Sequence, residues 1–181
     1  MRPLAFRPMR APGSAVLVIG EPCIGDDVIR RVAVKGIAVA RGRVLMLRPS
    51  GRDDLKFPGG GLAPGEDDAT ALTRELVEEC GHELVRITGH AVDTLERRPA
   101  NDRAGAVFEM SSRYYWCDVH DARLPRSLDD YERDLVLEPE WLPIDEARRV
   151  CARAATGRDA LPWAARELAV VEWLRSRTGT V

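Results

Sequence analysis

The segment 60–82 combines glycines, four glutamates and one arginine at intervals that suit metal-assisted chemistry on a phosphate chain. Three of the acids, Glu75, Glu78 and Glu79, stand at positions i, i+3 and i+4, which share one side of a helix. Like charges at this spacing repel one another, and Arg74 alone cannot neutralise three carboxylates. A magnesium or manganese ion can, because these hard cations prefer oxygen ligands. The segment therefore predicts a helix whose acidic side holds a divalent cation.

The same segment carries signals for both ends of this helix. Pro64 and Gly65 predict a turn, and the acids Glu66–Asp68 that follow suit the positive end of the helix dipole. Gly81 predicts the end of the helix. An isolated acidic run is usually a solvated helix face, but a glycine run and an arginine at fixed distances favour a binding site. The side chains that we expect to be buried are Ala69, Leu72, Leu76 and Cys80.

The intervals in this segment read G-x5-E-x7-R-E-U-x-E-E-x-G-U, where U is a bulky apolar residue. This pattern resembles the signature of the Nudix hydrolases, with His82 at the last U position as the one departure. The resemblance extends over roughly residues 31–147. It implies an α+β Nudix fold, in which a mixed β-sheet is sandwiched between α-helices in an α/β/α arrangement.

The resemblance also implies catalytic and metal-binding roles. Glu78 and Glu79 would be the principal metal ligands, and Glu75 would be a further ligand or the base that helps to deprotonate the attacking water. The backbone carbonyl of Gly60 or Gly59 is another candidate ligand, because glycine lets the chain approach an ion closely.

The other named residues of the pattern would support these ligands. Arg74 would form a salt bridge with Glu66 or Glu75 and so orient the acids. Glu66 and Gly81 are therefore interpreted as structural residues, the first as a partner for the arginine and the second as the helix stop.

The implied reaction is hydrolysis of the pyrophosphate linkage of a nucleoside diphosphate joined to another moiety X, with water attacking phosphorus beside Mg²⁺ or Mn²⁺. X would make the substrate a nucleotide sugar, ADP-ribose or a nucleoside triphosphate. Two alternatives stay open: a house-cleaning diphosphatase for oxidised or noncanonical nucleoside triphosphates, and a non-catalytic Nudix module that senses a nucleotide. The intact set of glutamates argues against the sensor.

Further candidates lie on either side of the glycine run. Arg48, Arg52 and Lys56 precede it and are candidates to meet phosphates, and Phe57 is a candidate to contact the rest of the substrate. A mobile loop before Trp141 would be able to deliver another acid once substrate is bound. The candidates for this extra acid are Glu132, Asp134, Glu138 and Glu140, with Glu109 in a predicted strand as a further one.

Length and charge bound the remaining possibilities. With 181 residues, we expect a single domain over residues 14–181, preceded by a flexible arm at 1–13. A net charge of -2 gives no electrostatic reason to expect nucleic acid or an anionic membrane as a partner. The chain has no transmembrane-length apolar run and no signal-peptide core, which favours the cytoplasm. Burial of Leu4, Phe6 and Met9 from the arm would favour a homodimer, with simple disorder as the alternative.

The four cysteines, at positions 23, 80, 117 and 151, form no C-x-x-C pair, and the three histidines are also scattered. Neither a zinc site nor a disulfide framework is indicated. We interpret the cysteines as reduced, small apolar residues.

Periodicity predicts the elements that must position the acidic helix. The valine-rich stretches 31–40 and 43–47 are expected to form a hairpin around a turn at Arg41 and Gly42. Hairpins and long strands without regular βαβ units favour an α+β fold. Further strands are expected at 15–19, 85–95, 106–119 and 140–142, and helices at 144–155 and 161–177.

Overall fold

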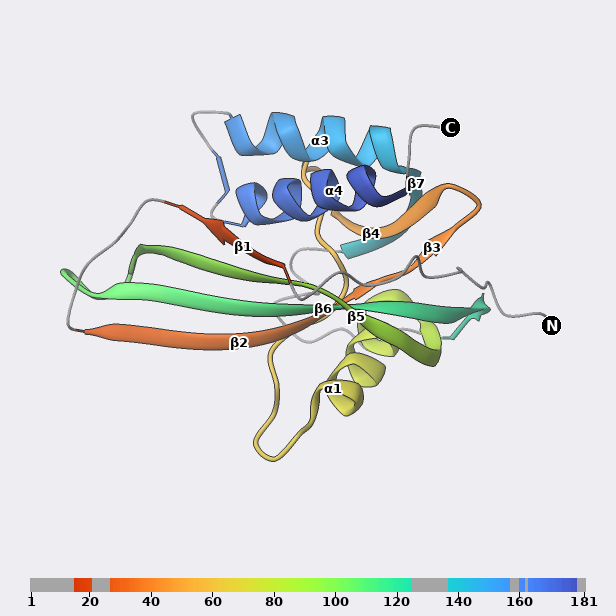
Figure 1. Ribbon diagram of the computed structural model, residues 1–181, viewed down its shortest axis with the longest axis horizontal. Helices are drawn as coiled ribbons and strands as arrows, with labels where there is room; N and C mark the ends of the chain where they lie inside the picture. The colour runs from red at the N-terminus through yellow and green to blue at the C-terminus, as the bar shows by residue number, and fades with distance from the viewer. Residues whose placement is uncertain (1–14, 21–26, 125–136, 157–159, 162, 179–181) are drawn as a thin grey trace.

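The computed structural model describes residues 15–20, 27–124, 137–156, 160–161 and 163–178 (Figure 1). Each predicted strand and helix has a counterpart, with ends that differ by a few residues. The expected arm at 1–13 and Cys23 lie outside the described residues. In chain order the elements are β1 (Val16–Ile19), β2 (Val28–Ile37), β3 (Val39–Ala40), β4 (Arg43–Pro49), α1 (Asp68–Glu75), the π-helical turn η1 (Leu76–Cys80), β5 (His82–Pro99), β6 (Val107–Arg123), β7 (Leu137–Pro143), α3 (Ile144–Thr156) and α4 (Ala164–Thr178).

The strands form two sheets. The larger has the order β1-β5-β6-β2, and the smaller has the order β3-β4-β7. In the larger sheet β5 and β6 are antiparallel, whereas β1 runs parallel to β5 and β2 runs parallel to β6. The sheet is therefore mixed, as the resemblance implied, and β2 forms one of its edges.

The single strand predicted over residues 31–40 is two strands. β2 pairs in parallel with β6, whereas β3 pairs antiparallel with β4 in the other sheet. Ala38 lies between them, is buried, and accepts a hydrogen bond from the Leu45 amide at 3.0 Å. The valine-rich pattern is the same on both sides of Ala38, so it could not reveal the change of sheet.

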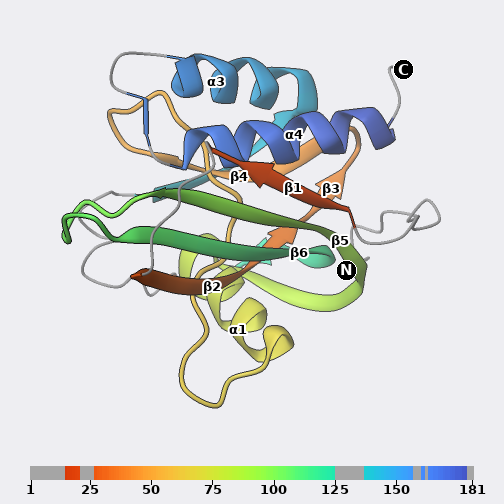
Figure 2. The same ribbon diagram turned by 60° about the vertical axis from the view of Figure 1, so that its left-hand side comes forward.

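Helices cover both sides of the sheets (Figures 1 and 2). α3 and α4 lie on one side and α1 lies on the other, which confirms the α/β/α arrangement. Two separate groups of buried residues fill the two interfaces. The group beneath α3 and α4 includes Ile37, Phe57, Tyr114, Val150, Val171 and Leu174. The group beneath α1 and η1 includes Val34, Leu45, Leu72, Leu76, Cys80 and Val119.

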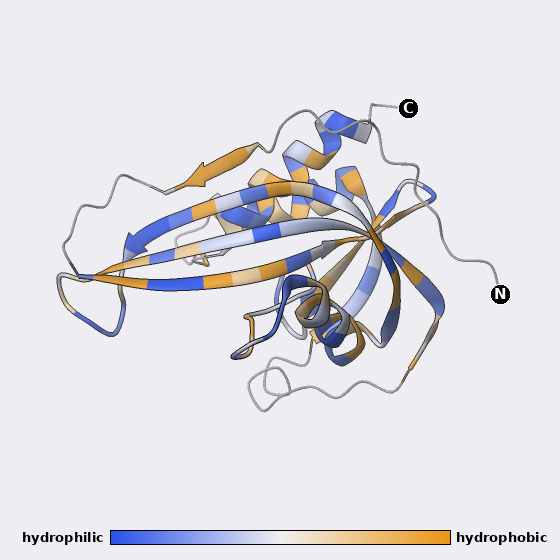
Figure 3. Ribbon diagram, turned by 60° about the horizontal axis from the view of Figure 1, so that its bottom comes forward, coloured by the Kyte–Doolittle hydropathy of each residue, from blue (hydrophilic) through white to orange (hydrophobic). Residues whose placement is uncertain are grey.

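Hydrophilic and hydrophobic segments alternate along the long strands (Figure 3). One face of the larger sheet nevertheless carries buried polar side chains. Thr94 lies opposite Ser112, and Lys35 lies opposite Tyr114. Glu96, two residues along β5 from Thr94, shares this face because side chains of a strand alternate with a period of two. All five are less than 8 % exposed, so this face holds more polar chemistry than an ordinary core.

The acidic helix begins and ends as predicted but changes pitch inside. The Asp67 side chain caps it by accepting a hydrogen bond from the Thr70 amide at 2.8 Å. Gly81 ends it in the left-handed conformation at φ 68°. The last turn, η1, is a π-helix, in which the Gly81 amide reaches the Leu76 carbonyl. Such widened turns occur frequently at functional sites.

The predicted buried stripe of this helix needs one correction. Leu72, Leu76 and Cys80 are fully buried, but Ala69 is exposed and Ala71 is buried instead. Ala69 lies in the first turn of α1, where its neighbour Thr70 is exposed as well.

The three described cysteines, Cys80, Cys117 and Cys151, are free and buried. Burial raises the pKa of the Cys117 and Cys151 thiols to about 12. Both thiols therefore stay protonated at neutral pH, which agrees with the interpretation that they are packing residues.

The terminal helix α4 buries charge as well as apolar surface. Val171 and Leu174 are fully buried, whereas Leu168 is partly exposed. Arg166 and Glu167 are also buried, with 5 % and 0 % exposure. No helix in the described ranges is both long enough and apolar enough to cross a membrane.

We predict that Asp67→Ala lowers the free energy of unfolding by about 1 kcal/mol, because it removes the side chain that caps the acidic helix. Chemical denaturation measures this change. Asp67→Asn is the matched control, since asparagine caps a helix as well as aspartate does. Equal stability of the alanine variant and the parent chain would contradict the role of this cap.

Candidate active site

The glycine run lies along the edge of β2. The Val34 amide donates to the Gly60 carbonyl, and the Gly36 amide donates to the Pro58 carbonyl, each at 2.9 Å. Gly59 adopts φ 123°, and a Cβ atom there would overlap the Val34 carbonyl. Glycine is required because it tolerates both this conformation and this close approach. The run is therefore fixed against the sheet.

Two of the predicted metal ligands are buried directly behind this run. Glu75 and Glu79 are 6 % and 5 % exposed. A carboxylate oxygen of Glu79 accepts a hydrogen bond from the Gly59 amide at 2.6 Å. A Cβ atom at position 60 would overlap the Glu75 carboxylate. The missing side chain of Gly60 thus leaves the space that the carboxylate of Glu75 occupies.

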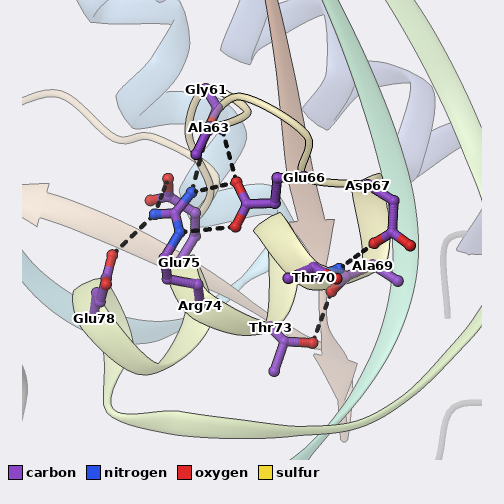
Figure 4. A network of polar contacts seen from close by, with 10 residues as sticks. All are labelled: Gly61, Ala63, Glu66, Asp67, Ala69, Thr70, Thr73, Arg74, Glu75 and Glu78. Atoms are coloured by element: carbon purple, nitrogen blue, oxygen red, sulfur yellow. Dashed lines mark hydrogen bonds and ion pairs between the residues drawn. The ribbon is translucent and has the colours of Figure 1, made fainter.

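Arg74 binds three of the glutamates at once (Figure 4). Its Nε and Nη2 atoms donate to the two oxygens of Glu66, each at 3.0 Å. Its Nη1 atom donates to Glu75 at 2.8 Å and to Glu78 at 3.0 Å. A further bond runs from Nη2 to the Gly61 carbonyl at 3.2 Å. Both alternatives that the sequence left for the arginine's partner, Glu66 and Glu75, are present.

These contacts fix the charge states of the pair. Hydrogen bonds from Arg74 lower the pKa of the Glu66 carboxyl, and the Ala63 amide, which donates to it at 2.8 Å, lowers it further. In turn, the hydrogen bonds to Glu66 raise the pKa of Arg74. Both groups are therefore ionised at neutral pH, and the two-pronged contact holds the guanidinium in one orientation.

The donor chemistry fits a divalent cation. Three glutamates share one arginine here, a fourth accepts from the Gly59 amide, and carboxylate oxygens are the ligands that Mg²⁺ and Mn²⁺ prefer. Among the described residues, no three His, Cys, Asp or Glu side chains converge as metal ligands do. Arg74 donates to both Glu75 and Glu78, and Glu79 accepts from the Gly59 amide. Glu78, with 35 % of its side chain exposed, lies on the open side.

The two arginines predicted to meet phosphates are engaged in ion pairs. Arg48 donates from Nε to both oxygens of Glu140, at 3.0 and 3.1 Å, and these bonds raise its pKa. Arg52 donates from Nε to Asp54 at 3.0 Å. Both arginines are partly exposed, and their role in substrate binding stays a prediction.

Phe57 was predicted to contact the substrate. Its side chain is fully buried and packs edge-on against Tyr114, with ring centroids 5.6 Å apart. The ring therefore belongs to the core, and a role for Phe57 in substrate binding stays a prediction. Its neighbour Lys56 lies instead over the Trp163 ring, with the ammonium 4.1 Å from the centroid.

Three of the candidate extra acids, Glu109, Glu138 and Glu140, lie in the described part of the chain. Glu138 is exposed on β7 opposite Arg48. Glu140 pairs with Arg48, and Glu109 forms ion pairs with two arginines at 3.2 and 2.6 Å. Glu132 and Asp134 lie outside the described residues. The use of Glu138 or Glu132 in catalysis stays a prediction.

The sequence analysis did not predict a basic cleft that lies beside the glycine run. It has a volume of about 270 Å³. One signal was present, because Lys35 is the sole charge in the apolar stretch 32–40. The residues that bring positive charge to its walls are Arg31, Lys35, Lys56, Arg98 and Arg166.

Comparisons with known proteins agree with this geometry. A family model described as NUDIX domain matches residues 29–164. An RNA pyrophosphohydrolase of Legionella pneumophila is 56% identical over 39 residues, which is 22% of each chain. One from Proteus mirabilis is 41% identical over 58 residues, 32% of this chain and 33% of that protein. The chain thus matches between about a fifth and a third of the length of these curated relatives.

A solved structure shows the same fold. The NUDIX hydrolase from Nitrosomonas europaea superposes with a TM-score of 0.50 at 23% identity, over 80% of this chain and 90% of that one. At this identity the likeness supports the fold alone.

We predict that Gly60→Ala weakens Mn²⁺ binding by about 10-fold to 100-fold, because the new methyl group displaces the Glu75 carboxylate. Electron paramagnetic resonance of free Mn²⁺ measures the affinity. Gly61→Ala is the matched control: the nearest atom to its new Cβ lies 3.9 Å away. If the two variants bind Mn²⁺ equally well, the proposed contact between positions 60 and 75 is unimportant for metal.

Proposed function

Because the chain belongs to the Nudix family, we propose that it is a metal-dependent pyrophosphohydrolase. Its substrate would be a nucleoside diphosphate linked to another moiety X, cleaved at the pyrophosphate linkage by water attack on phosphorus. Nudix hydrolases generally use divalent metal ions, and we propose Mg²⁺ or Mn²⁺ here. The observation that carries the proposal is the contact of Arg74 with three glutamates, beside a fourth glutamate held by the glycine run.

The side chains divide into metal ligands and a positioning residue. Glu75, Glu78 and Glu79 would hold the cation with the Gly60 carbonyl, which has a second lone pair besides the one used by the Val34 amide. The cation supplies charge neutralisation for the diphosphate and a lowered pKa for bound water. Arg74 would position the acids, since it donates hydrogen bonds to Glu75 and Glu78.

Glu75 and Glu79 are held where water is scarce. Their burial increases the strength of electrostatic interactions with a bound diphosphate, because the local dielectric constant is low. Preorganised charge of this kind accounts for most of the rate enhancement in phosphoryl transfer, where the protein forms no covalent bond. Glu75 as the base and Glu75 as a ligand both remain compatible with this arrangement.

Two narrower possibilities define the substrates to compare. A house-cleaning diphosphatase would prefer oxidised or noncanonical nucleoside triphosphates. The curated relatives are named RNA pyrophosphohydrolase, which adds RNA to the comparison. A non-catalytic sensor is disfavoured, because nucleotide binding alone does not require four buried or paired glutamates around one arginine.

We predict that Glu79→Gln lowers kcat by about 100-fold or more, because it removes a charged oxygen donor from the metal site. Product release with Mg²⁺ or Mn²⁺ measures it, over nucleoside triphosphates, ADP-ribose, nucleotide sugars, dinucleoside polyphosphates and triphosphorylated RNA. Glu83→Gln, at an exposed position on β5, is the matched control. Turnover that survives in Glu79→Gln, or that needs no metal, would overturn the assignment. Binding of nucleotides without turnover of any of them would favour the sensor.

A further inference from the structure

The basic cleft and the acidic helix lie on opposite sides of the loop that contains Gly59. The Lys35 ammonium donates to the Phe57 carbonyl at 3.1 Å and also to the Gly59 carbonyl. On the other side, the amide of the same Gly59 donates to Glu79. A substrate whose diphosphate lies beside the glutamates would therefore extend into the cleft past a single residue of loop.

The cleft is strongly positive. Five cationic side chains line it, against Glu96 as the one acidic side chain. Arg166 is compensated, because it donates to Glu96 at 2.7 Å and to Glu167 at 2.9 Å. Lys35 is only 7 % exposed and its described contacts are neutral carbonyl groups. Buried positive charge of this kind is costly without an anion, so the cleft favours an anionic ligand.

Two aromatic rings fix cations at the wall of the cleft. The Arg98 guanidinium lies over the Phe108 ring at 4.2 Å, and the Lys56 ammonium lies over the Trp163 ring at 4.1 Å. Cation–π contacts of this length hold a charge against the face of the ring. The positive charges are thus positioned before any ligand arrives.

Arg98 also presents an unused donor. Its Nε atom is buried and forms no hydrogen bond with any described residue. It forms an ion pair with a carboxylate oxygen of Glu96 at 3.5 Å, beyond ordinary hydrogen-bond length. A buried N–H without an acceptor costs free energy, and a phosphate oxygen in the cleft is an acceptor of the right charge.

The charge state of Lys56 points the same way. Burial, followed by repulsion from Lys35, lowers the pKa of Lys56. A bound anion would offset both effects, because it replaces the lost solvation and screens the two ammonium groups from each other.

We propose that this cleft binds a phosphate group of the substrate beyond the scissile anhydride. This inference rests on the proposed function and narrows it. The enzyme would then favour substrates that carry an additional phosphate, such as nucleoside triphosphates, over nucleotide sugars whose second half is uncharged. Arg98 and Lys56 are the residues that determine this specificity.

Two neighbouring arginines on β5 give a matched test. Arg98 lines the cleft, whereas Arg97 points to the other face and pairs with Glu109 at 2.6 Å. For UTP and UDP-glucose, which share one nucleoside, we expect Arg98→Gln to raise KM for UTP by about 10-fold, the usual effect of losing a charged hydrogen bond. It should leave kcat for UTP and both constants for UDP-glucose little changed. Arg97→Gln should leave KM and kcat unchanged for both substrates. Lys56→Met serves as a second variant if Arg98→Gln loses its thermal transition.

Binding without turnover separates this inference from the proposed function. Isothermal titration calorimetry with tripolyphosphate, on the parent chain and on Arg98→Gln, requires no catalysis. If Arg98→Gln binds tripolyphosphate more weakly than the parent chain does, this result supports a phosphate site in the cleft even if no nucleotide is hydrolysed. Conversely, metal-dependent turnover that is equal for UTP and UDP-glucose, and unaffected by Arg98→Gln and Lys56→Met, would leave the enzyme assigned and overturn the phosphate site.

Discussion

The absence of side chains at positions 59 and 60 is the constraint on which the rest of the site depends. The glycine run lies between the edge of β2 and the acidic helix, and a methyl group at either position would overlap its neighbour. With hydrogen there instead, the backbone pairs with β2 on one side and contacts two carboxylates on the other. The sheet, through this loop, thereby sets the position of the acids.

The need for Arg74 follows from the burial of these carboxylates. Glu75 and Glu79 are removed from water, and unpaired buried charge is destabilising by several kcal/mol in typical cases, so each needs a fixed partner. The guanidinium supplies partners to Glu66, Glu75 and Glu78 together, and the Gly59 amide supplies one to Glu79. The cluster still contains more carboxylates than cations. That imbalance is tolerable for a protein whose missing charge is brought by a metal ion.

The sequence predicted the parts of the site that are close together along the chain. The helix, its cap region, its glycine stop and two of the arginine's partners, Glu66 and Glu75, follow from spacing within residues 60–82, because helical geometry is local. The buried position of Phe57 and the split of strand 31–40 were not predicted, since each depends on which sheet a residue joins. The cleft was missed for the same reason: Lys35, Arg98 and Arg166 come together only through strand pairing and the packing of α4.

The peptide groups of Gly59 explain how opposite charges are kept apart at so short a range. Its N–H points to Glu79 and its C=O points to Lys35, so the backbone dipoles favour a negative group on one side of the loop and a positive group on the other. A direct Lys35–Glu79 ion pair would neutralise both and leave neither for a ligand. Because the loop separates them, the acidic side remains available to a cation and the basic side to a phosphate, which is the division of charge that a metal-bound phosphate chain requires.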